Sequence, residues 1–600
     1  MLLSKVYMKK YSSIGRLLTL GLGFALPVAA GNWPGWRGPD GNGVSPDKDL
    51  PLRWSGKENV RWRVELPGPG NSSPIVWGDR VFVSQAIAAE HKRTLMCFDR
   101  NSGKLLWQSG VTYTADEPTQ ENNPHCAGTP ATDGELVFVC FGSAGVFAYD
   151  FAGREVWHRD LGKLNHMFGT AVSTVLHGGL CYVNFGPGEQ VRLVALKKAT
   201  GEIAWEAAPP KLDPSEQSGG PGGPGGPGGG GRGGFGPGTF LAPQMLAQGA
   251  KSGQSQLSPA EFAALADAWF DKLDPQKSGK LSRSEFTASF ASLLPPPPGA
   301  DGPPGGGRGG GPGGMAAGGL FTAADTDQDG SLTRTEWQST FARWARDWDT
   351  DKAGSLNEDK LRTGLNASLA RPGAGGPGRG GRGGMGGGGG PNGSWSTPIV
   401  VKASDHEELV VGFPNRLAAY DPATGRQLWV SKGLGGSIYA SPVAGPDVVV
   451  ALSSGMGGGS AVALRPGGTG EIAESQRIWR LERVKGGMGS GVISGGYFYT
   501  ISQDGIAACL DLQDGKTVWE ERLKGSTSRG SSWSSLLLAD GRIYIPNQAG
   551  DVFVLRAGPK FEVLATNSVG EPTNASLAAA NHDLFFRSNR ALWCFMDAKP

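Results

Sequence analysis

Short stretches in which apolar residues alternate with polar ones recur along the first and the last third of the chain. Residues 80–83 and 136–139 are examples in which most side chains are β-branched or aromatic, and the pair Asp133-Gly134 precedes the second of them. Such runs predict short strands, and the Gly-containing pairs between them predict tight turns. We therefore expect antiparallel sheets of short strands in these two parts of the chain.

A five-residue unit that begins with Gly and ends with Trp recurs beside these stretches. The copies are Gly103–Trp107, Gly153–Trp157, Gly201–Trp205, Gly425–Trp429 and Gly515–Trp519. Each repeat, read from one copy to the next, holds four predicted strands, and repeats of this length with four strands are typical of a β-propeller. We expect each Trp to fill the space between neighbouring blades, with its N–H on a carbonyl.

The number of repeats predicts an all-β, eight-bladed propeller. The units end near Trp107, Trp157, Trp205, Trp429, Trp479, Trp519, Leu564 and Phe595. The last unit is one strand short, and residues 60–64 offer a spare strand near the N-terminus. Adding this strand to the last blade closes the ring and removes an open sheet edge. Seven blades stay the alternative.

Helical patterning replaces the strand pattern between Trp205 and Ser394, where about 175 extra residues separate two repeats. Residues 259–272 and 335–348 each place aromatic side chains on one face of a predicted helix. Gly- and Pro-rich runs, which cannot bury enough apolar surface to fold, flank these helices. The insert is therefore predicted to be an α-helical module that is joined to the propeller by linkers.

These features divide the chain into a signal peptide, two parts of one propeller, two linkers and the module. The signal peptide is 1–30, the propeller is 31–205 (blades 1–3 and the closing strand) and 394–600 (blades 4–8), the linkers are 206–256 and 371–393, and the module is 257–370 with an internal Gly/Pro-rich run at 295–319.

The strongest chemical motif is an EF-hand loop, a twelve-residue calcium-binding loop, at residues 325–336. Oxygen ligands for Ca²⁺ are expected from side chains at positions 1, 3, 5, 9 and 12 and from the backbone at position 7. These residues are Asp325, Asp327, Asp329, Ser331, Thr333 and Glu336. Four carboxylates this close repel one another without a cation, so we expect calcium there.

Two weaker loops of the same length flank this motif. Residues 274–285 keep the acidic first and last positions but offer neutral oxygens between them, and residues 349–360 end in Lys360 in place of the last Glu. The candidate ligands of the first loop are Asp274, Gln276, Ser278, Lys280 and Glu285. The candidate ligands of the second loop are Asp349, Asp351, Ser355 and Asn357. We expect the loop with Lys360 to serve mainly as a structural partner.

The N-terminus and the charge indicate export and exclude some partners. Residues 1–30 combine basic residues, an apolar run and small residues before Gly31, so we expect a cleaved signal peptide, no transmembrane anchor afterwards and a periplasmic or secreted protein. The net charge of +2 does not favour nucleic acid. Of the six cysteines, Cys126 and Cys140 are the best candidates for a disulfide, and burial as free thiols is the alternative.

The Asp-x-x-x-Gly-x-x-x-Trp pattern resembles the repeats of pyrroloquinoline-quinone (PQQ) dehydrogenases and of BamB-type assembly factors. The opening Trp33–Asp40 resembles that of secreted PQQ-like propeller proteins. The resemblance covers residues 33–205 and 394–597 and implies a quinoprotein-like propeller. The enzymes of this group use a vicinal disulfide and a propeller-bound calcium, and the chain has no vicinal Cys pair and no motif onto which their catalytic residues map. PQQ is therefore not the expected cofactor.

We expect an exported, calcium-binding, non-catalytic scaffold with protein partners. A PQQ- or small-molecule-dependent oxidoreductase and a carbohydrate-binding propeller are the alternatives, since one propeller fold carries both enzymes and binding proteins. Five side chains are candidates to face the central funnel and stack a ligand or pack between blades. They are Asn71, Trp395, Tyr439, Trp533 and Asn574.

Overall fold

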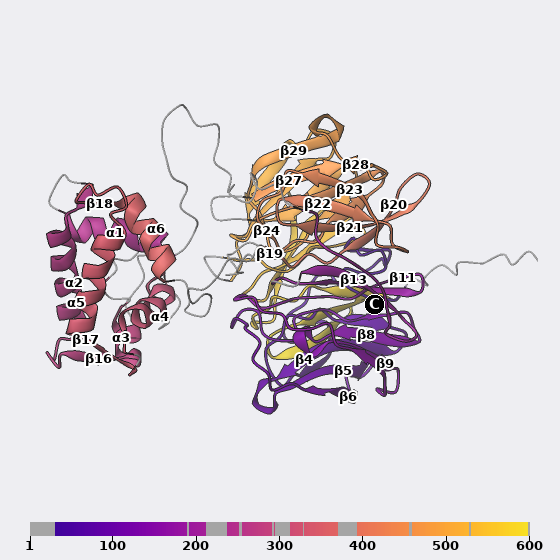
Figure 1. Cartoon of the computed structure of the whole chain (residues 1–600). Coiled ribbons are helices and arrows are strands. Elements are labelled where there is room, and N and C mark those ends of the chain that lie inside the picture. Colours follow the sequence, from indigo (N-terminus) through magenta and orange to yellow (C-terminus); the bar gives the residue numbers. More distant parts are fainter. Residues whose placement is uncertain are drawn as a thin grey trace, which may run out of the picture.

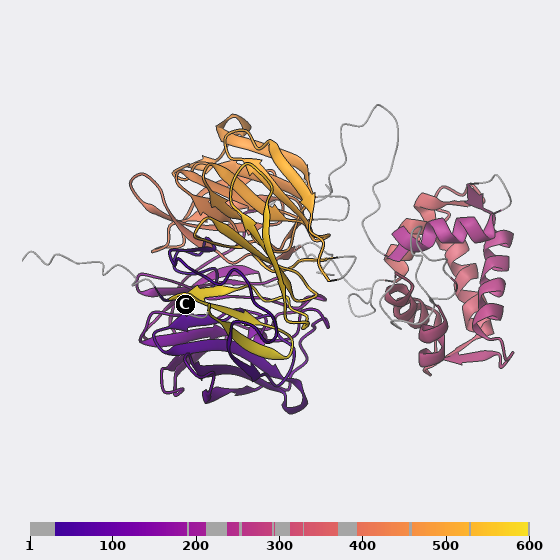
Figure 2. The same cartoon turned by 180° about the vertical axis from the view of Figure 1, so that it is seen from behind.

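A computed structural model describes the propeller and the helical module. The described residues are 31–188, 191–211, 237–250, 255–290, 293, 312–327, 329–369, 393–454, 459–526 and 530–597. The expected signal peptide at 1–30 and residues 371–392 of the second linker lie outside this range. Figures 1 and 2 show a ring of sheets built from both ends of the chain, and a separate group of helices from its middle.

Each of the first four blades is a four-stranded antiparallel sheet in which consecutive strands pair. Blade 1 is β3 (Ile75–Trp77), β4 (Arg80–Ile87), β5 (Lys92–Asp99) and β6 (Leu105–Thr112). Blade 2 is β7 (Ala131–Thr132), β8 (Leu136–Cys140), β9 (Val146–Asp150) and β10 (Glu155–Arg159). Blade 3 is β11 (Val175–His177), β12 (Leu180–Phe185), β13 (Arg192–Lys197) and β14 (Ile203–Ala207). Blade 4 is β20 (Ile399–Lys402), β21 (Glu407–Phe413), β22 (Arg416–Tyr420) and β23 (Gln427–Lys432), extended by β28 (Gly470–Glu471).

The remaining blades complete a ring of eight. Blade 5 is β25 (Val443–Gly445), β26 (Val448–Leu452), β27 (Gly459–Leu464) and β29 (Arg477–Val484). Blade 6 is β30 (Val492–Ser494), β31 (Tyr497–Ile501), β32 (Ile506–Asp511) and β33 (Thr517–Arg522). Blade 7 is β34 (Leu537–Ala539), β35 (Arg542–Pro546), β36 (Asp551–Arg556) and β37 (Val563–Ser568), with β1 (Val44–Ser45) on its inner edge. Blade 8 is β38 (Ala578–Ala580), β39 (Asp583–Arg587), β40 (Ala591–Phe595) and β2 (Val60–Glu65). β19 (Gly393–Ser394) and β24 (Ser437–Ile438) form a further parallel pair.

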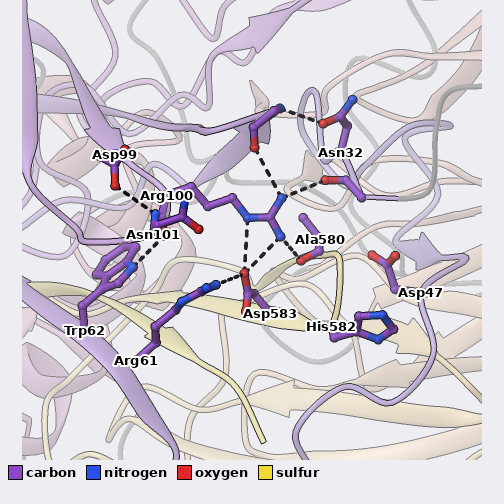
Figure 3. A network of polar contacts seen from close by, with 12 residues as sticks. Asn32, Asp47, Arg61, Trp62, Asp99, Arg100, Asn101, Ala580, His582 and Asp583 are labelled. Carbon is purple, nitrogen blue, oxygen red and sulfur yellow. Dashed lines mark hydrogen bonds and ion pairs between the residues drawn. The ribbon is translucent and has the colours of Figure 1, made fainter. Parts of the chain in front are cut away.

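The ring closes as the repeat count predicts, so the prediction of eight blades is confirmed. Strand β2 pairs antiparallel with β40, which joins the N-terminal part of the chain to the last blade. Figure 3 shows the polar contacts at this junction: Asp583 accepts hydrogen bonds from Arg61 at 2.8 Å and from Arg100 of blade 1 at 3.0 Å. The side chain of Asp583 is only 5% exposed. A buried carboxylate shared by two guanidinium groups therefore fastens the ring.

The tryptophan of each repeat contacts the next blade. The indole N–H of Trp107 donates to the carbonyl of Phe151 at 2.9 Å, and the ring lies against Gly153. Gly153 has φ +84°, and a Cβ there would be 2.7 Å from the ring, so both the backbone and the packing require glycine. In blade 8 this role falls to Trp62 of β2, which donates to the carbonyl of Arg100 at 2.7 Å. The hydrogen bond to a carbonyl of the next blade is also made by Trp157, Trp205, Trp479 and Trp519. Trp429 departs from the expectation, because its indole N–H is buried without a hydrogen-bond partner among the described residues.

A ring of hydroxyl groups links the blades at the start of their innermost strands. We call this set the inner hydroxyl ring: Ser73, Thr129, Ser173, Thr397, Ser441, Ser490, Ser535 and Ser576. The backbone N–H of one member donates to the hydroxyl oxygen of the next at 2.9–3.0 Å, from Ser73 to Ser173 and from Thr397 round to Ser73. Among the described residues the one junction without this bond is that between Ser173 and Thr397, where the insert leaves and re-enters the ring.

The N-terminal segment 31–45 crosses the inside of the propeller. Trp33 exchanges two backbone hydrogen bonds with Val76 of blade 1, and the carbonyl of Pro34 accepts from blade 2. Trp36 donates to the hydroxyl of Ser441 in blade 5, and β1 pairs with β34 of blade 7. Contacts with blades on opposite sides of the ring place this segment in the central channel.

The module contains six helices among the described residues. They are α1 (Pro237–Gly249), α2 (Pro259–Leu273), α3 (Arg283–Phe290), α4 (Pro312–Ala324), α5 (Arg334–Asp347) and α6 (Glu358–Ser368). The predicted helices 259–272 and 335–348 match α2 and α5 to within one residue at each end. Their aromatic side chains form the core as expected, and those of Phe262, Trp269, Trp337 and Phe341 are fully buried.

Two helices correct the boundaries expected for the linkers. Helix α1 lies inside the stretch 206–256, and α4 begins inside the Gly/Pro-rich run 295–319. Their low helix propensity is offset by packing, because Leu241 and Met245 of α1 and Leu320 and Phe321 of α4 are buried in the module core.

The module is an internal duplication. Helices α1, α2 and α3 begin 75 positions before α4, α5 and α6 respectively. The halves join through two short antiparallel pairs: β16 (Lys280–Ser282) with β17 (Ser331–Thr333), and β15 (Gln256–Leu257) with β18 (Leu356–Asn357). The leucines at the centre of these pairs face each other, Leu281 with Leu332 and Leu257 with Leu356. This pairing is the way in which EF-hand loops are held together, so the module has four loop positions, and the sequence predicted three.

Candidate metal centre

The loop 325–336 joins α4 to α5 and gathers three carboxylates. Oxygen atoms of Asp325, Asp327 and Glu336 lie within 4.8 Å of one another. Ligands on opposite sides of a calcium ion at about 2.4 Å are about 4.8 Å apart, so the spacing fits calcium. Gly330 has φ +82°, the left-handed turn that the sixth position of such a loop requires.

One oxygen of this cluster is buried without a partner. Asp325 is 7% exposed, and its Oδ1 has no hydrogen-bond donor among the described residues, while Oδ2 accepts from the N–H of Gly330 at 3.2 Å. A buried carboxylate oxygen without a donor is costly, and a cation satisfies it. The orphaned oxygen is therefore evidence for an ion at this place that is independent of the motif.

The charges of the loop act on one another. The N–H of Asp329 lowers the pKa of Asp327, which is exposed, but desolvation and the carboxylates of Asp329, Glu336 and Asp325 outweigh it and raise this pKa. Such mutual repulsion is what a divalent cation relieves.

The last ligand, Glu336, is held in place by its own loop. Burial alone would raise the pKa of Glu336, but hydrogen bonds from Thr333 and from the N–H groups of Asp327 and Thr326 lower it to about 2. Its Oε2 accepts from the N–H of Thr333 at 2.9 Å, which makes a capping box at the start of α5. Glu336 is therefore ionised and oriented at neutral pH.

Three further predicted ligands, Asp329, Ser331 and Thr333, lie along this loop. Asp329 accepts a hydrogen bond from the N–H of Ser331 at 2.7 Å, so its carboxylate turns back over the loop. Ser331 and Thr333 are the ends of β17, where the backbone of Ser331 pairs with Ser282 of the neighbouring loop. The structure thus brings the three acidic residues of the cluster together and sets the other predicted ligands along the same loop.

The loop 274–285 has a partial set of ligands. Asp274 is buried and accepts from the N–H groups of Ser278 and Gly279 at 2.9 and 2.7 Å. Glu285 accepts from the N–H of Ser282 at 2.8 Å, as Glu336 does from Thr333. Gln276 and Lys280 are exposed. The first and last ligands are thus in place, with neutral oxygens between them.

The loop 349–360 is built differently, because a lysine occupies its centre. The Nζ of Lys360 donates to Oδ1 of Asp349 at 2.7 Å, to Oδ1 of Asp351 and to the carbonyl of Ser355 at 2.9 Å. Asn357 caps α6 by accepting from the N–H of Lys360. The predicted ligands Asp349, Asp351 and Ser355 are therefore brought together around an ammonium group.

The five predicted funnel residues contact the chain itself. The rings of Trp395 and Tyr439 stack at 4.9 Å, and Trp395 donates to the carbonyl of Gly169 at 3.0 Å. Asn71 and Asn574, from different blades, both donate to the carbonyl of Asn122 at 2.9 and 3.1 Å. The indole N–H of Trp533 is buried without a partner among the described residues. Packing between blades accounts for four of the five.

Two buried arginines near the axis also bind backbone. Arg37 donates to the carbonyls of Asn42, Ser490 and Gly491, and burial lowers its pKa to about 9. Arg587 donates to the carbonyls of Ser72 and Ser84. The guanidinium groups of both arginines are thus engaged by carbonyl groups of the chain itself.

The cysteine alternatives are also resolved in the structure. Cys126 and Cys140 are free buried thiols, as are the other four cysteines. Burial raises the pKa of both to about 12, so they behave as small apolar side chains.

Sequence reasoning missed the fourth loop position, whereas it expected the loop that ends in Lys360 to be mainly a structural partner. By the 75-residue offset, Asp325 and Glu336 correspond to Ala250 and Glu261. Because Ala250 is not acidic, no motif reveals this loop. The capping box of Ser258 and Glu261, the counterpart of Thr333 and Glu336, was the available signal.

None of the helices in the described part of the chain is long and apolar enough to cross a membrane.

Comparison with known proteins identifies both parts of the chain. A family model described as outer membrane protein assembly factor BamB matches residues 55–166 and 337–598, which is more than half of the chain, and an EF-hand model matches residues 319–342. No match was found among the curated proteins.

Several solved structures are similar in outline. BamB from Moraxella catarrhalis is 10% identical with a TM-score of 0.43, over 90% of this chain and 99% of that one. A europium-containing methanol dehydrogenase is 12% identical with a TM-score of 0.40, over 92% and 89%. The quinohemoprotein alcohol dehydrogenase from Comamonas testosteroni is 12% identical with a TM-score of 0.36, over 95% and 81%. On its family-model matches and its eight closed blades, the chain belongs to the BamB family of PQQ-like β-propeller proteins and carries an EF-hand module between its third and fourth blades.

Proposed function

We propose that the chain is an exported calcium-binding scaffold, in which the propeller binds protein partners without catalysis and the module binds Ca²⁺. The observation that carries the proposal is the cluster of Asp325, Asp327 and Glu336, whose oxygens have calcium spacing and include one buried atom without a donor. Six to eight hard oxygens are what calcium prefers, and the loop supplies them from side chains and backbone.

The arrangement of the propeller axis supports the non-catalytic part. Segment 31–45 lies in the central channel, and the buried Arg37 and Arg587 donate to carbonyl groups of the chain itself. The remaining surfaces are the two faces and the outer strands, which suit protein partners that add a strand or cover a face. The family match to BamB points in the same direction, and the signal-like residues 1–30 fit export.

A calorimetric titration tests the calcium site. The mature chain should bind calcium with dissociation constants of about 10⁻⁴–10⁻³ M, the range of extracellular modules. Glu336→Gln should remove the tightest component, whereas Glu358→Gln, an exposed change on the neighbouring helix, should leave it in place. An isotherm of Glu336→Gln that equals that of the parent chain would refute the assignment.

A spectrum with added quinone tests the non-catalytic part. The mature chain is mixed with PQQ and calcium, and its visible absorption and its reduction of a dye in the presence of alcohols are recorded. We expect neither a stoichiometric spectral shift nor dye reduction. Both together would overturn the scaffold and favour an oxidoreductase.

A calcium-dependent pull-down from the native envelope tests the partners. Proteins retained in calcium, released by a chelator and not retained by Glu336→Gln would identify partners of the module. Proteins retained in both conditions would be partners of the propeller.

A further inference from the structure

The two loop pairs of the module differ in their charge. We name the loops 274–285 and 325–336 the carboxylate pair, because both begin with Asp and end with Glu and they join through β16 and β17. We name residues 250–261 and 349–360 the lysine pair, because Lys360 ends the second loop and they join through β15 and β18. Each pair takes one loop from each half, and the two loops that are equivalent by the duplication lie in different pairs.

In the lysine pair, the ammonium group of Lys360 contacts the groups that an EF-hand loop gives to its ion. Asp349, Asp351 and the carbonyl of Ser355 are the first, third and seventh positions, and Nζ of Lys360 donates to all three. An ammonium has three donors, so these contacts use them all. The side chain of Lys360 is 12% exposed and that of Asp349 is 17% exposed, so the contact is largely shielded from water.

The other member of the lysine pair also lacks ion-binding character. Its first position is Ala250, and its last acidic residue, Glu261, accepts from the N–H and hydroxyl of Ser258 at 2.9 and 2.7 Å. Leu257 faces Leu356 across the pair, and both are fully buried. This end of the module is therefore joined by apolar contact and by capping.

We propose that Lys360 is a built-in cation that keeps the lysine pair folded without calcium, so that calcium acts on the carboxylate pair alone. The module then has one fixed end and one calcium-responsive end. The role of Lys360 goes beyond the proposed function, because it concerns the lysine pair, whereas the calcium response of the carboxylate pair rests on the proposed function.

Hydrogen exchange of the full mature chain, followed by mass spectrometry in calcium and in chelator, tests the inference. We expect chelation to speed exchange in residues 325–336 and to leave residues 349–360 unchanged. Lys360→Met should speed exchange in residues 349–360 equally with and without calcium, since two carboxylates lose their counter-charge. Lys352→Met, which removes an exposed lysine from the same loop, is the matched control and should have no such effect.

A gain of function provides the second test. Lys360→Glu restores the last carboxylate beside Asp349 and Asp351, so it should make exchange in residues 349–360 calcium-dependent and raise the calcium stoichiometry by about one ion. The inference is overturned if chelation speeds exchange in residues 349–360 of the parent chain, or if Lys360→Met behaves like Lys352→Met. Failure of calcium to affect residues 325–336 would instead contradict the proposed function.

Discussion

The propeller and the helical module are held together by different kinds of contact. In the described part of the chain, neighbouring blades are joined by neutral hydrogen bonds of the inner hydroxyl ring at every junction except that between blades 3 and 4. Several junctions also have an indole that lies against a glycine, and one has the buried Asp583. The module is an aromatic core with acidic loops at its ends, and one of these loops has a buried oxygen without a donor. Junctions of the propeller thus rest on contacts within the chain, whereas one loop of the module gathers carboxylates around a buried oxygen that lacks a donor among the described residues.

Removing the carboxylate that fastens the ring should have the largest effect. Asp583→Ala leaves Arg100 buried without its counter-charge, and breaking a buried pair costs about 3–5 kcal/mol. Calorimetric scans should show a lower melting temperature for the propeller and an unchanged one for the module. The exposed change Asp116→Ala is the control. Equal melting temperatures of the propeller in the two variants would show that Asp583 does not stabilise the closure of the ring.

A matched pair of glycines tests the indole contact. Gly103 and Gly78 both have positive φ, but a Cβ at Gly103 would lie 2.7 Å from the ring of Trp62, whereas one at Gly78 would meet nothing within 4 Å. Backbone strain costs about 1–2 kcal/mol in either variant, and overpacking adds about 1–3 kcal/mol at Gly103. In denaturant unfolding, the free energy of unfolding of Gly103→Ala should therefore be clearly lower than that of Gly78→Ala. Equal losses would mean that the backbone alone requires glycine.

A smaller effect is expected from acid at the last blade. Burial alone would raise the pKa of Glu571, but hydrogen bonds from Ser588, Arg63 and Trp593 lower it below its usual 4.5. The stability from this lowered pKa is fully present above about pH 4.5 and is lost as the pH falls through the lower, folded-state value. In Glu571→Gln, the free energy of unfolding of the propeller should fall less steeply between pH 5 and pH 3 than in the parent chain, by less than about 1 kcal/mol. Unfolding experiments at pH 3–5 measure this difference. The exposed change Glu58→Gln is the control. If the unfolding free energy of Glu571→Gln depends on pH as steeply as that of the control and of the parent chain, Glu571 does not contribute to the acid sensitivity.

The sequence was sufficient for the features that repeat or that carry a motif. The Gly-to-Trp units predicted the blades and the docking of Trp107, and the spare strand at 60–64 predicted closure, because these depend on local pattern and counting. The acidic loop at 325–336 was found because calcium binding demands Asp and Glu at fixed places.

The missed features depend on contacts between distant residues or on a lost motif. The path of segment 31–45 across the channel is set by blades that are far away in the sequence, such as that of Ser441. Helix α1 was read as linker because its surroundings are rich in Gly, and its burial against α6 cannot be seen from propensity. The loop that starts with Ala250 has no carboxylate at its first position, so the sequence shows no acidic motif there.

The difference between the propeller and the module is tested most directly by calorimetric scans of the chain at increasing calcium concentration. At a calcium concentration about 100 times the dissociation constant, each bound ion stabilises the folded state by about 2.7 kcal/mol. The account predicts that the melting temperature of the module rises, that this rise shrinks in Glu336→Gln, and that the melting temperature of the propeller stays constant. A module that does not respond to calcium, or a propeller that responds as strongly as the module, would contradict it.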